Sequence, residues 1–517
     1  MGSPVTSLTG TLPAGSADGH PAAPRADVLP AGIRVRTAER LPMTTAASPP
    51  SGDALTGTTA PGTSALGPRG LLILITLCGA TFMTGLDYSI ITVALPEIGR
   101  DLGFASTGDL QWVATACLLP TAGLLPLFGR LCDLVGRRRL FVLGAALFTA
   151  LSLLAAAATG PALLIAARAG QGVAAAMIGP TALALMTASF PEGPRRTKAL
   201  GINGALLSLG FVTGTIGGGL ITSGFNWRWT MLLLALIGSA VLVGALTVLP
   251  ASADARRAGR LDVPGALLSS AGLFALVYAI STGADAGWAS APTLTALTGA
   301  VALLAAFLFT ESRHSAPLVP LGLLGRRTVK WSALVGLITF SMCGGATLLL
   351  SLYMQDVLGW SPLATGFGFL AEGAAALVAG TLASRVIAAR GTTAAMVSGL
   401  LVQAAGTGAM VLLPGNGSLP LLLVTSGLMG FGHVLAVVAF ISTLTSGLRD
   451  DEQGVAGSLA QMPQFVGAIG VAGLAAVAAS GDSLLAGLHA ALLVAGGTLL
   501  AGVLVAALFL RRRGPEC

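Results

Sequence analysis

The stretch GRLCDLVGRRR, residues 129–139, places one acid and four bases between two long apolar segments, approximately 109–128 and 140–158. An apolar run of about 20 residues is long enough to cross the hydrocarbon of a bilayer as a helix. Charged side chains are costly inside that hydrocarbon, so the stretch is typical of a loop at a membrane surface. It therefore predicts that the two flanking segments are neighbouring transmembrane helices.

The composition of the whole chain agrees with a membrane protein. Of 517 residues, 54% are hydrophobic and only 9% are charged, and the mean hydropathy is +0.85. Soluble proteins carry about 25% charged residues, so the composition excludes a water-soluble class. The five cysteines show no paired spacing, which predicts neither a disulfide framework nor a metal site.

Beyond residue 70 the chain holds fourteen apolar segments, each long enough to span as a helix. Their approximate limits are 71–94, 109–128, 140–158, 161–189, 201–222, 229–249, 263–282, 292–310, 331–352, 362–382, 392–413, 419–445, 455–477 and 484–510. The sequence therefore predicts an all-α integral membrane protein with fourteen transmembrane helices.

A weak internal echo suggests two related halves. GTLASRVIAARG, residues 380–391, resembles the stretch at 129–139 in having Gly-x-Leu at a helix end followed by bases. The two stretches occupy the same place in two six-helix units if the seventh and eighth segments are an inserted pair, and paired repeats are common in secondary transporters. The predicted parts are a disordered N-terminal tail (1–69), a six-helix half (70–250), two inserted helices with their loops (251–330), a second half (331–510) and a basic tail (511–517).

The bases predict the orientation of the chain. All but three of the 28 Lys and Arg residues lie in the N-terminal tail, in alternate loops or in the C-terminal tail, the exceptions being Arg100, Arg168 and Arg228. Because cytoplasmic loops are rich in Lys and Arg, both termini are expected in the cytoplasm and the protein in the cell membrane. This placement also accounts for the net charge of +7 without a nucleic-acid partner.

Four motifs, in this order and spacing, resemble those of the major facilitator superfamily, specifically its fourteen-span drug:proton antiporter branch. They are LDYSIITVALP (86–96), GRLCDLVGRRR (129–139), LIAARAGQGVAAA (164–176) and GINGALLSLGFVTGTIGGGL (201–220). The resemblance covers about residues 70 to 510 and implies the major facilitator fold, with two pseudo-symmetric halves around a central cavity. It also implies proton-coupled export of drugs.

The loop motif carries a proposed gate. It matches the family pattern at Gly129, Asp133, Gly136, Arg137 and Arg138. One interpretation is a latch, in which the acid pairs with bases or with a helix N-terminus across the interface between the halves in one conformation only. Such a contact differs between two states, as a switch requires. The alternative is that the bases only anchor the loop on the cytoplasmic side.

Two ionisable residues inside apolar segments are expected at one depth. Asp87 lies roughly 7 residues, or about 10 Å of helix, from the outer end of the first segment, and Arg168 lies similarly far along the fourth. An arginine stays charged and needs an anion inside a span. We predict that the two side chains face the central cavity and pair directly or through water. The alternative is that Arg168 reaches the surface and Asp87 caps a kink at Gly85.

Glu372 lies about ten residues into the tenth segment, near the expected bilayer midplane, with no base beside it in the sequence. Desolvation disfavours the charged form of a carboxyl group, so such a residue is suited to taking up and releasing a proton or to pairing with a cationic substrate. The alternative is a carboxyl group held by Ser or Gln of a neighbouring helix.

The fifth segment resembles the antiporter motif of the branch at Gly210, Gly214, Gly218 and Gly219, but Thr215 stands where Pro is expected. A proline there would remove one amide hydrogen bond and bend the helix. The glycines still permit close packing, so export remains the favoured direction, with an importer or uniporter as the alternative.

Further polar residues within the spans are weaker candidates. Gln171, Asn203 and His433 either line the cavity or, more commonly for such residues, form hydrogen bonds between helices. GPRRTKALG lacks the spacing of a nucleotide-binding P-loop, so we expect no ATP drive and no enzyme.

The sequence thus predicts a monomeric exporter of amphipathic, neutral or cationic small molecules. It uses protons as the coupling ion and no cofactor. An exporter of an endogenous metabolite, such as an amino acid or a siderophore, is the nearest alternative. A membrane sensor that transports nothing is the remote one.

Overall fold

The computed structural model describes residues 67–104, 107–250, 262–314, 317–319, 321–449 and 452–510, which all lie in one compact unit, Thr63–Cys517. The predicted N-terminal tail, except its last three residues, lies outside the described residues. So do the loop at 251–261 and the basic tail at 511–517.

The N-terminal half consists of six long helices. They are α1 (Pro68–Leu102), α2 (Thr107–Val135), α3 (Arg137–Ala156), α4 (Pro161–Ser189), α5 (Pro194–Gly224) and α6 (Arg228–Thr247). Pro68, Pro161 and Pro194 stand at helix starts, where proline's fixed φ suits the first turn and its missing N–H is not needed. Most of these helices run beyond the predicted apolar segments, because the helical backbone continues past the hydrophobic residues.

Two helices, α7 (Val263–Ala286) and α8 (Ala291–Arg313), follow as the predicted inserted pair, and a short helix, α9 (Leu321–Gly325), comes after them. The side chain of Asp262 caps the start of α7 by accepting a hydrogen bond from the amide of Gly265. α7 packs against α2 of the first half and against α15 of the second, whereas α8 packs mainly against α7.

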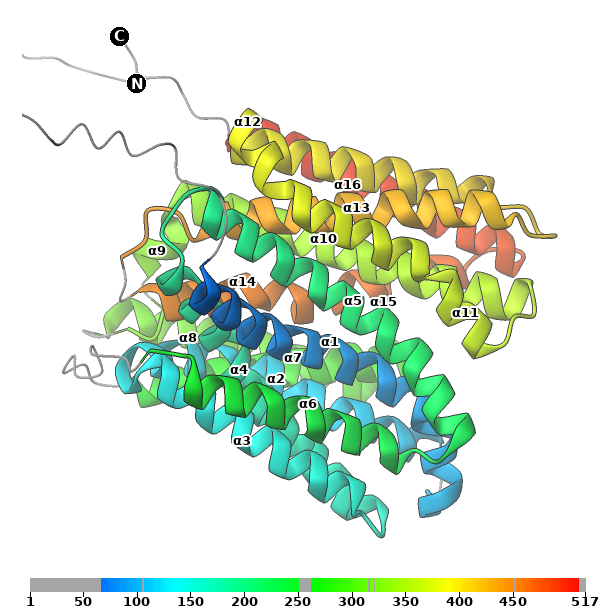
Figure 1. Ribbon diagram of the computed structural model, residues 1–517. Helices are drawn as coiled ribbons and strands as arrows, with labels where there is room; N and C mark the ends of the chain where they lie inside the picture. Colours follow the sequence, from blue (N-terminus) through cyan, green and yellow to red (C-terminus); the bar gives the residue numbers. More distant parts are fainter. Residues whose placement is uncertain are drawn as a thin grey trace, which may run out of the picture. The chain divides into compact units, whose positions relative to one another are not determined.

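The C-terminal half is more interrupted. Its elements are α10 (Arg327–Leu352), η1 (Tyr353–Val357), α11 (Pro362–Gly368), α12 (Leu370–Ala409), η2 (Met410–Leu412), α13 (Leu419–Leu444), α14 (Gln453–Val466), α15 (Ala468–Ala479) and α16 (Leu484–Phe509). Figure 1 shows these helices running side by side with those of the first half.

In the described part of the chain, thirteen helical stretches are long and apolar enough to cross a membrane, and one of them, Leu363–Leu412, has 50 residues. Inside it, Gly391 has a non-helical backbone with φ 82°. On either side of that glycine, Glu372 and Gly406 approach the same turn of α13, at Gly430 and Met429. A straight helix would hold residues 372 and 406 about 50 Å apart. The chain therefore turns back at Gly391, and its two arms complete the predicted fourteen spans.

The thirteenth predicted span, 455–477, is broken into α14 and α15 at Gly467. The helical hydrogen bond from the amide of Gly467 to the carbonyl of Pro463 is kept, whereas Pro463, one turn earlier, cannot donate an amide hydrogen bond to the turn before it. Both parts pack against α10, but α14 also packs against α2 and α4, whereas α15 packs against α7 and α16.

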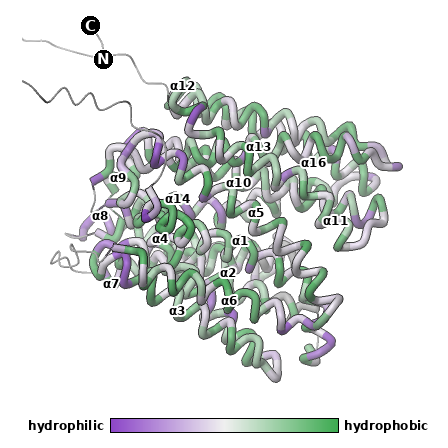
Figure 2. Tube along the Cα trace, in the orientation of Figure 1, coloured by the Kyte–Doolittle hydropathy of each residue, from purple (hydrophilic) through white to green (hydrophobic). Residues whose placement is uncertain are grey.

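Polar residues gather where the helices end. Figure 2 shows hydrophobic residues along the helices and hydrophilic residues at the turns between them. Many large apolar side chains are exposed on the outside of the bundle, for example Leu236, Leu267 and Leu504. Outward-facing apolar side chains are the expected surface of helices that lie in lipid. The chain is thus an all-helical membrane protein, as predicted.

Candidate functional site

Asp87 of α1 and Arg168 of α4 form an ion pair in the N-terminal half. The Arg168 Nη1 and the Asp87 Oδ1 lie 2.5 Å apart, and the exposed fractions of the two residues are 1% for Arg168 and 6% for Asp87. The predicted direct pair is therefore present, and Arg168 does not reach the surface.

Further polar groups surround this pair. The Arg168 Nε donates to the carbonyl of Val113 at 3.1 Å, and its Nη1 donates to the Gln171 Oε1 at 2.9 Å. The Gln171 Nε2 donates in turn to the Ser152 Oγ at 2.8 Å. A buried charge pair is tolerated when hydrogen bonds satisfy the groups around it. Four helices, α1 to α4, thus share one buried polar cluster.

The polar contacts of the pair all come from helices of the N-terminal half, and both side chains are buried. That the two side chains face a central cavity stays a prediction. The sequence placed both residues at one depth, but it did not show which helix faces meet. Because the two charges neutralise each other, burying the pair within one half costs much less free energy than burying either charge alone.

The second oxygen of Asp87 is held more weakly. The Cys117 Sγ lies 3.7 Å from the Asp87 Oδ2 and is placed to donate to it. A thiol is a weak donor, so this oxygen is the less firmly bound of the two. The Asp87 Oδ1 is therefore bound strongly, by Arg168, and the Oδ2 only weakly, by the Cys117 thiol.

Glu372 of α12 has no such partner. Its Oε2 is buried and accepts no hydrogen bond, and within the described residues Glu372 forms no ion pair. The side chain lies against α13, where its Cγ would be 2.7 Å from a Cβ added to Gly430. The room for this acid depends on that glycine. No Ser or Gln of a neighbouring helix bonds the Glu372 Oε2, so the alternative interpretation is not supported for this oxygen.

Asp133 joins the two halves. Its Oδ1 accepts a hydrogen bond of 3.1 Å from the amide of Gly454, in the first turn of α14, and lies 3.8 Å from the Arg137 Nη2. Amides in the first turn of a helix lack helical partners and carry partial positive charge, so they bind carboxylates well. This is the predicted contact between the acid and a helix N-terminus.

Two glycines allow that contact. A Cβ on Gly129 would lie 2.8 Å from the Ser458 Cβ, and a Cβ on Gly454 would lie 2.4 Å from the carbonyl oxygen of Gly129. A second bond between the halves lies nearby, from the amide of Gly447 to the Glu192 Oε1 at 3.1 Å. Asp133, Glu192 and Gly454 lie at the same end of the bundle as the loops that are rich in Lys and Arg. We call this end the basic side.

Two further residues of the loop motif, Gly136 and Arg138, act within the first half. Gly136 has φ 107°, a conformation that favours glycine, and it forms the turn between α2 and α3. The Arg138 Nη2 donates to the carbonyl of Leu246 at 2.7 Å, at the end of α6. In this state Asp133 accepts a hydrogen bond from the C-terminal half, while Arg138 holds α3 to α6.

The glycine-rich face of α5 lies directly on the helix that carries Asp87. Added Cβ atoms on Gly210 and Gly214 would lie 2.4 Å from the carbonyl oxygen of Phe82 and 2.7 Å from that of Leu86, and one on Gly218 would lie 2.9 Å from the Ile90 Cγ1. No larger residue fits without moving one helix.

An adjoining face of α5 meets the C-terminal half. A Cβ on Gly219 would lie 3.4 Å from the Leu363 Cδ1, and one on Gly366 would lie 3.2 Å from the Thr215 Cγ2. The Thr215 Oγ1 donates to the carbonyl of Phe211 at 3.0 Å, an acceptor within its own helix. The helix continues unbroken through Thr215, as expected without the family's proline.

The remaining polar candidates bond between helices. Asn203 of α5 accepts a hydrogen bond of 2.7 Å from Thr81 of α1. His433 lies 3.2 Å from the Thr339 Oγ1, through its Nδ1, and Thr339 donates to the Gln403 Oε1 at 2.6 Å. These contacts support the interhelical interpretation. In the part of the chain that the structure describes, no three His, Cys, Asp or Glu side chains gather as metal ligands.

Sequence reasoning missed several partners in these sites. The Cys117 thiol and the Val113 carbonyl lie one helical turn apart on α2, and nothing in the sequence marks either as a neighbour of the ion pair. Ser152 and the amide of Gly454 were missed for the same reason, since a common hydroxyl or a backbone group has no signature of its own.

Comparisons with known proteins agree with the motifs. The sequence profile of the family described as the Major Facilitator Superfamily matches residues 77–472. The cephamycin export protein CmcT of Amycolatopsis lactamdurans is 40% identical over 419 residues, which cover 79% of this chain and 85% of that protein. The puromycin resistance protein pur8 of Streptomyces alboniger is 38% identical over 411 residues, covering 78% and 81%.

A third relative, the multidrug resistance protein Stp of Mycobacterium tuberculosis (strain CDC 1551 / Oshkosh), is 33% identical over 412 residues, covering 79% of this chain and 76% of that protein. Among solved structures, the human organic anion transporter MFSD10 (TETRAN) matches with a TM-score of 0.61 over 85% of this chain and 100% of that one. Its identity is 17%, so that likeness concerns the fold alone.

Proposed function

Because the chain belongs to the major facilitator superfamily, we propose that it exports amphipathic, neutral or cationic drugs or antibiotics across the cell membrane in exchange for protons. The names of its relatives support export and resistance as the direction and outcome. The observation that carries proton coupling is the buried ion pair of Asp87 and Arg168 inside the membrane-spanning bundle.

That pair links protonation to helix contacts. A proton taken up by Asp87 would neutralise the carboxylate and leave the Arg168 charge without its anion in a buried site. An uncompensated buried charge is unfavourable, so the helices would rearrange to solvate or re-pair it. Protonation would thereby favour one arrangement of α1 and α4, and release of the proton the other. The loosely held Oδ2, beside Cys117, is the atom best placed to accept the proton.

Glu372 is the proposed second acid. It lacks a neighbouring base, so it is free to hold a proton or the cationic group of a substrate. Two acids and one base in the spans favour neutral or cationic cargo over anionic cargo. One proton moving down 100 mV supplies about 2.3 kcal/mol, so one or two protons would suffice for useful accumulation.

Asp133 is the proposed latch of the alternating-access cycle. Its bond to the start of α14 holds the two halves together at the basic side. The positive-inside rule supports placing this side, and both termini, in the cytoplasm. The conformation would then be one whose cytoplasmic end is closed, and the next step in the cycle would break the bond between Asp133 and Gly454.

Transport in inverted membrane vesicles tests the proposal. A panel of fluorescent dyes and antibiotics is followed in vesicles that carry the wild-type protein, Asp87→Asn or Glu372→Gln, with and without a proton ionophore. We expect ionophore-sensitive uptake by the wild type, none by Asp87→Asn, and selective loss of cationic cargo by Glu372→Gln. Uptake unchanged by the ionophore would exclude antiport, and the absence of any transported drug would point to an endogenous metabolite.

A further inference from the structure

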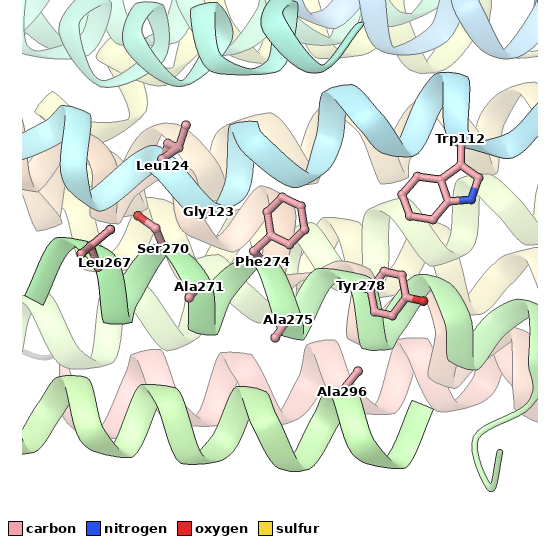
Figure 3. Close-up of a pocket in the computed structure, with 10 residues that line it drawn as sticks. All are labelled: Trp112, Gly123, Leu124, Leu267, Ser270, Ala271, Phe274, Ala275, Tyr278 and Ala296. Atoms are coloured by element: carbon pink, nitrogen blue, oxygen red, sulfur yellow. The ribbon is translucent and has the colours of Figure 1, made fainter. Parts of the chain in front are cut away.

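A groove of about 730 Å³ lies along the inserted helices and α2, and its lining includes neither Asp87 nor Glu372. Its lining includes Trp112 and Gly123 of α2, Phe274 and Tyr278 of α7, and Ala296 of α8. Figure 3 shows the lining residues on α2 and α7, with Ala296 on the neighbouring helix α8. Since all three helices are long and apolar enough to span a membrane, the groove opens toward hydrocarbon.

The polarity of the groove is uneven along its length. Trp112 and Tyr278 stack with ring centroids 6.1 Å apart, and Figure 3 places the indole nitrogen and the phenol oxygen at the same end. The remaining lining is Gly, Ala, Leu and Phe except for Ser270. Indole and phenol groups favour the headgroup level of a bilayer. The groove therefore suits a molecule with one polar end and a long apolar body.

The length of the groove matches half a bilayer. From Trp112 to Leu124 the α2 helix advances by about 18 Å, close to the roughly 15 Å of hydrocarbon in one leaflet. Trp112 lies near the start of α2, at the end of the bundle opposite Asp133. A molecule in the groove would thus have its polar end at the membrane surface opposite the basic side.

We propose that this groove binds one acyl chain of a membrane phospholipid, with the headgroup beside Trp112 and Tyr278. The apolar lining excludes a charged cargo group, and the aromatic end supplies the two polar atoms that a headgroup or glycerol ester would meet. This assignment concerns a structural lipid and does not depend on the proposed transport function.

The groove lies beside the junction at which α7 meets α2 and α14. Next to it, Leu119, Ala122 and Val277 form a small hydrophobic cluster against which Phe465 of α14 packs. Helix α7 is thus the element through which the inserted pair contacts both halves near the break at Gly467. An acyl chain lying along α2 and α7 would cover this junction from the outside.

Lipid retention tests the proposal. The full-length protein is exchanged into dodecyl maltoside, and phosphatidylglycerol bearing a diazirine in one acyl chain is titrated in. Native mass spectrometry counts the bound lipids, and peptide mapping after photolysis locates the cross-links. Ala271 is exposed and lines the groove, so Ala271→Leu places three more carbons in it without displacing a buried side chain. Ala302→Leu, at an exposed position of α8 outside the groove, is the matched control.

We expect the wild type and Ala302→Leu to retain one lipid that cross-links to α2 and α7. Ala271→Leu should retain it at least about tenfold less well, a change of about 1.4 kcal/mol in binding free energy. Ala296→Leu fills the groove from α8 and should behave likewise, and size-exclusion profiles and melting temperatures verify that each variant folds. Equal retention by all variants, or cross-links spread over every exposed helix, would overturn the site. Displacement of the lipid by rhodamine 6G would instead assign the groove to cargo, against the proposal.

Discussion

The two halves of the molecule place polar residues on corresponding helices but treat charge differently. In the first half, the first, third and fourth helices contribute Asp87, Ser152 and Arg168, which belong to one buried ionic cluster. In the second half, the corresponding helices α10, α12 (second arm) and α13 contribute Thr339, Gln403 and His433, which form a hydrogen-bonded cluster without an ion pair. Corresponding helices of the two halves thus hold an ionic cluster in one half and an uncharged hydrogen-bonded cluster in the other.

The difference predicts how each half responds to change. A buried ion pair adds little net stability, but removal of one partner leaves an uncompensated charge. A neutral hydrogen bond loses much less when it is broken. The ionic cluster of the first half should therefore be sensitive to protonation and to substitution, whereas the neutral cluster of Thr339, Gln403 and His433 should tolerate both. That asymmetry is what a proton-driven device needs if one half senses the proton.

The largest effect is expected when the charged centre is broken. Asp87→Asn leaves Arg168 buried without its anion, which should cost about 3–5 kcal/mol of folding free energy and abolish proton-coupled transport. Thermal unfolding in detergent and vesicle transport measure the two effects separately. In the double variant with Arg168→Gln the charge is gone as well, so stability should partly return. A double variant whose loss equals the sum of both single losses would show that the two residues are not coupled.

The next effect concerns the bond between the halves. Asp133→Ala removes the acceptor for the amide of Gly454, which should cost about 1.5–3 kcal/mol of the closed conformation, as for other bonds to charged groups. Spin labels at the exposed positions Arg139 and Arg390, one in each half, should report a longer distance at the basic side. Folding should be retained, because the bond lies between the halves and not inside either one. An unchanged distance distribution would show that Asp133 is no latch.

The neutral centre should respond less than the charged one. Thr339→Val keeps the shape of the side chain but removes the hydroxyl that bonds Gln403 and contacts His433. We expect a loss of about 1–1.5 kcal/mol, near the upper range for a neutral hydrogen bond, and transport that remains coupled to protons. The melting temperature and the ionophore-sensitive transport rate are the two measurements. A loss as large as that of Asp87→Asn would remove the distinction between the halves.

Much of this arrangement could be predicted from sequence, because charge inside hydrocarbon is rare and costly. Fourteen apolar runs predicted the helices, and the depths of Asp87 and Arg168 predicted their contact. The burial of that pair within one half could not be predicted, since the depth of a residue does not fix the direction in which a helix faces. The role of the Gly454 amide could not be predicted either, because every residue except proline carries the same backbone donor. The break at Gly467 did have a signal in Pro463, and the sequence alone did not show that α15 would meet α7.

The smallest effect on stability is expected for a substitution at Glu372. This substitution tests whether the acid serves transport without contributing to stability. Its Oε2 has no hydrogen-bond partner, so Glu372→Gln breaks no ion pair and removes the desolvation cost of a charge. The free energy of unfolding should change by less than about 1 kcal/mol, while transport of cationic dyes is lost and transport of neutral ones is kept. Melting curves and paired dye assays in the same vesicles measure both, and Asp87→Asn provides the opposite pattern of a destabilised, fully uncoupled protein. A strongly destabilised Glu372→Gln would mean that this acid is held by contacts, and the C-terminal half would then contain a second ionic centre of its own.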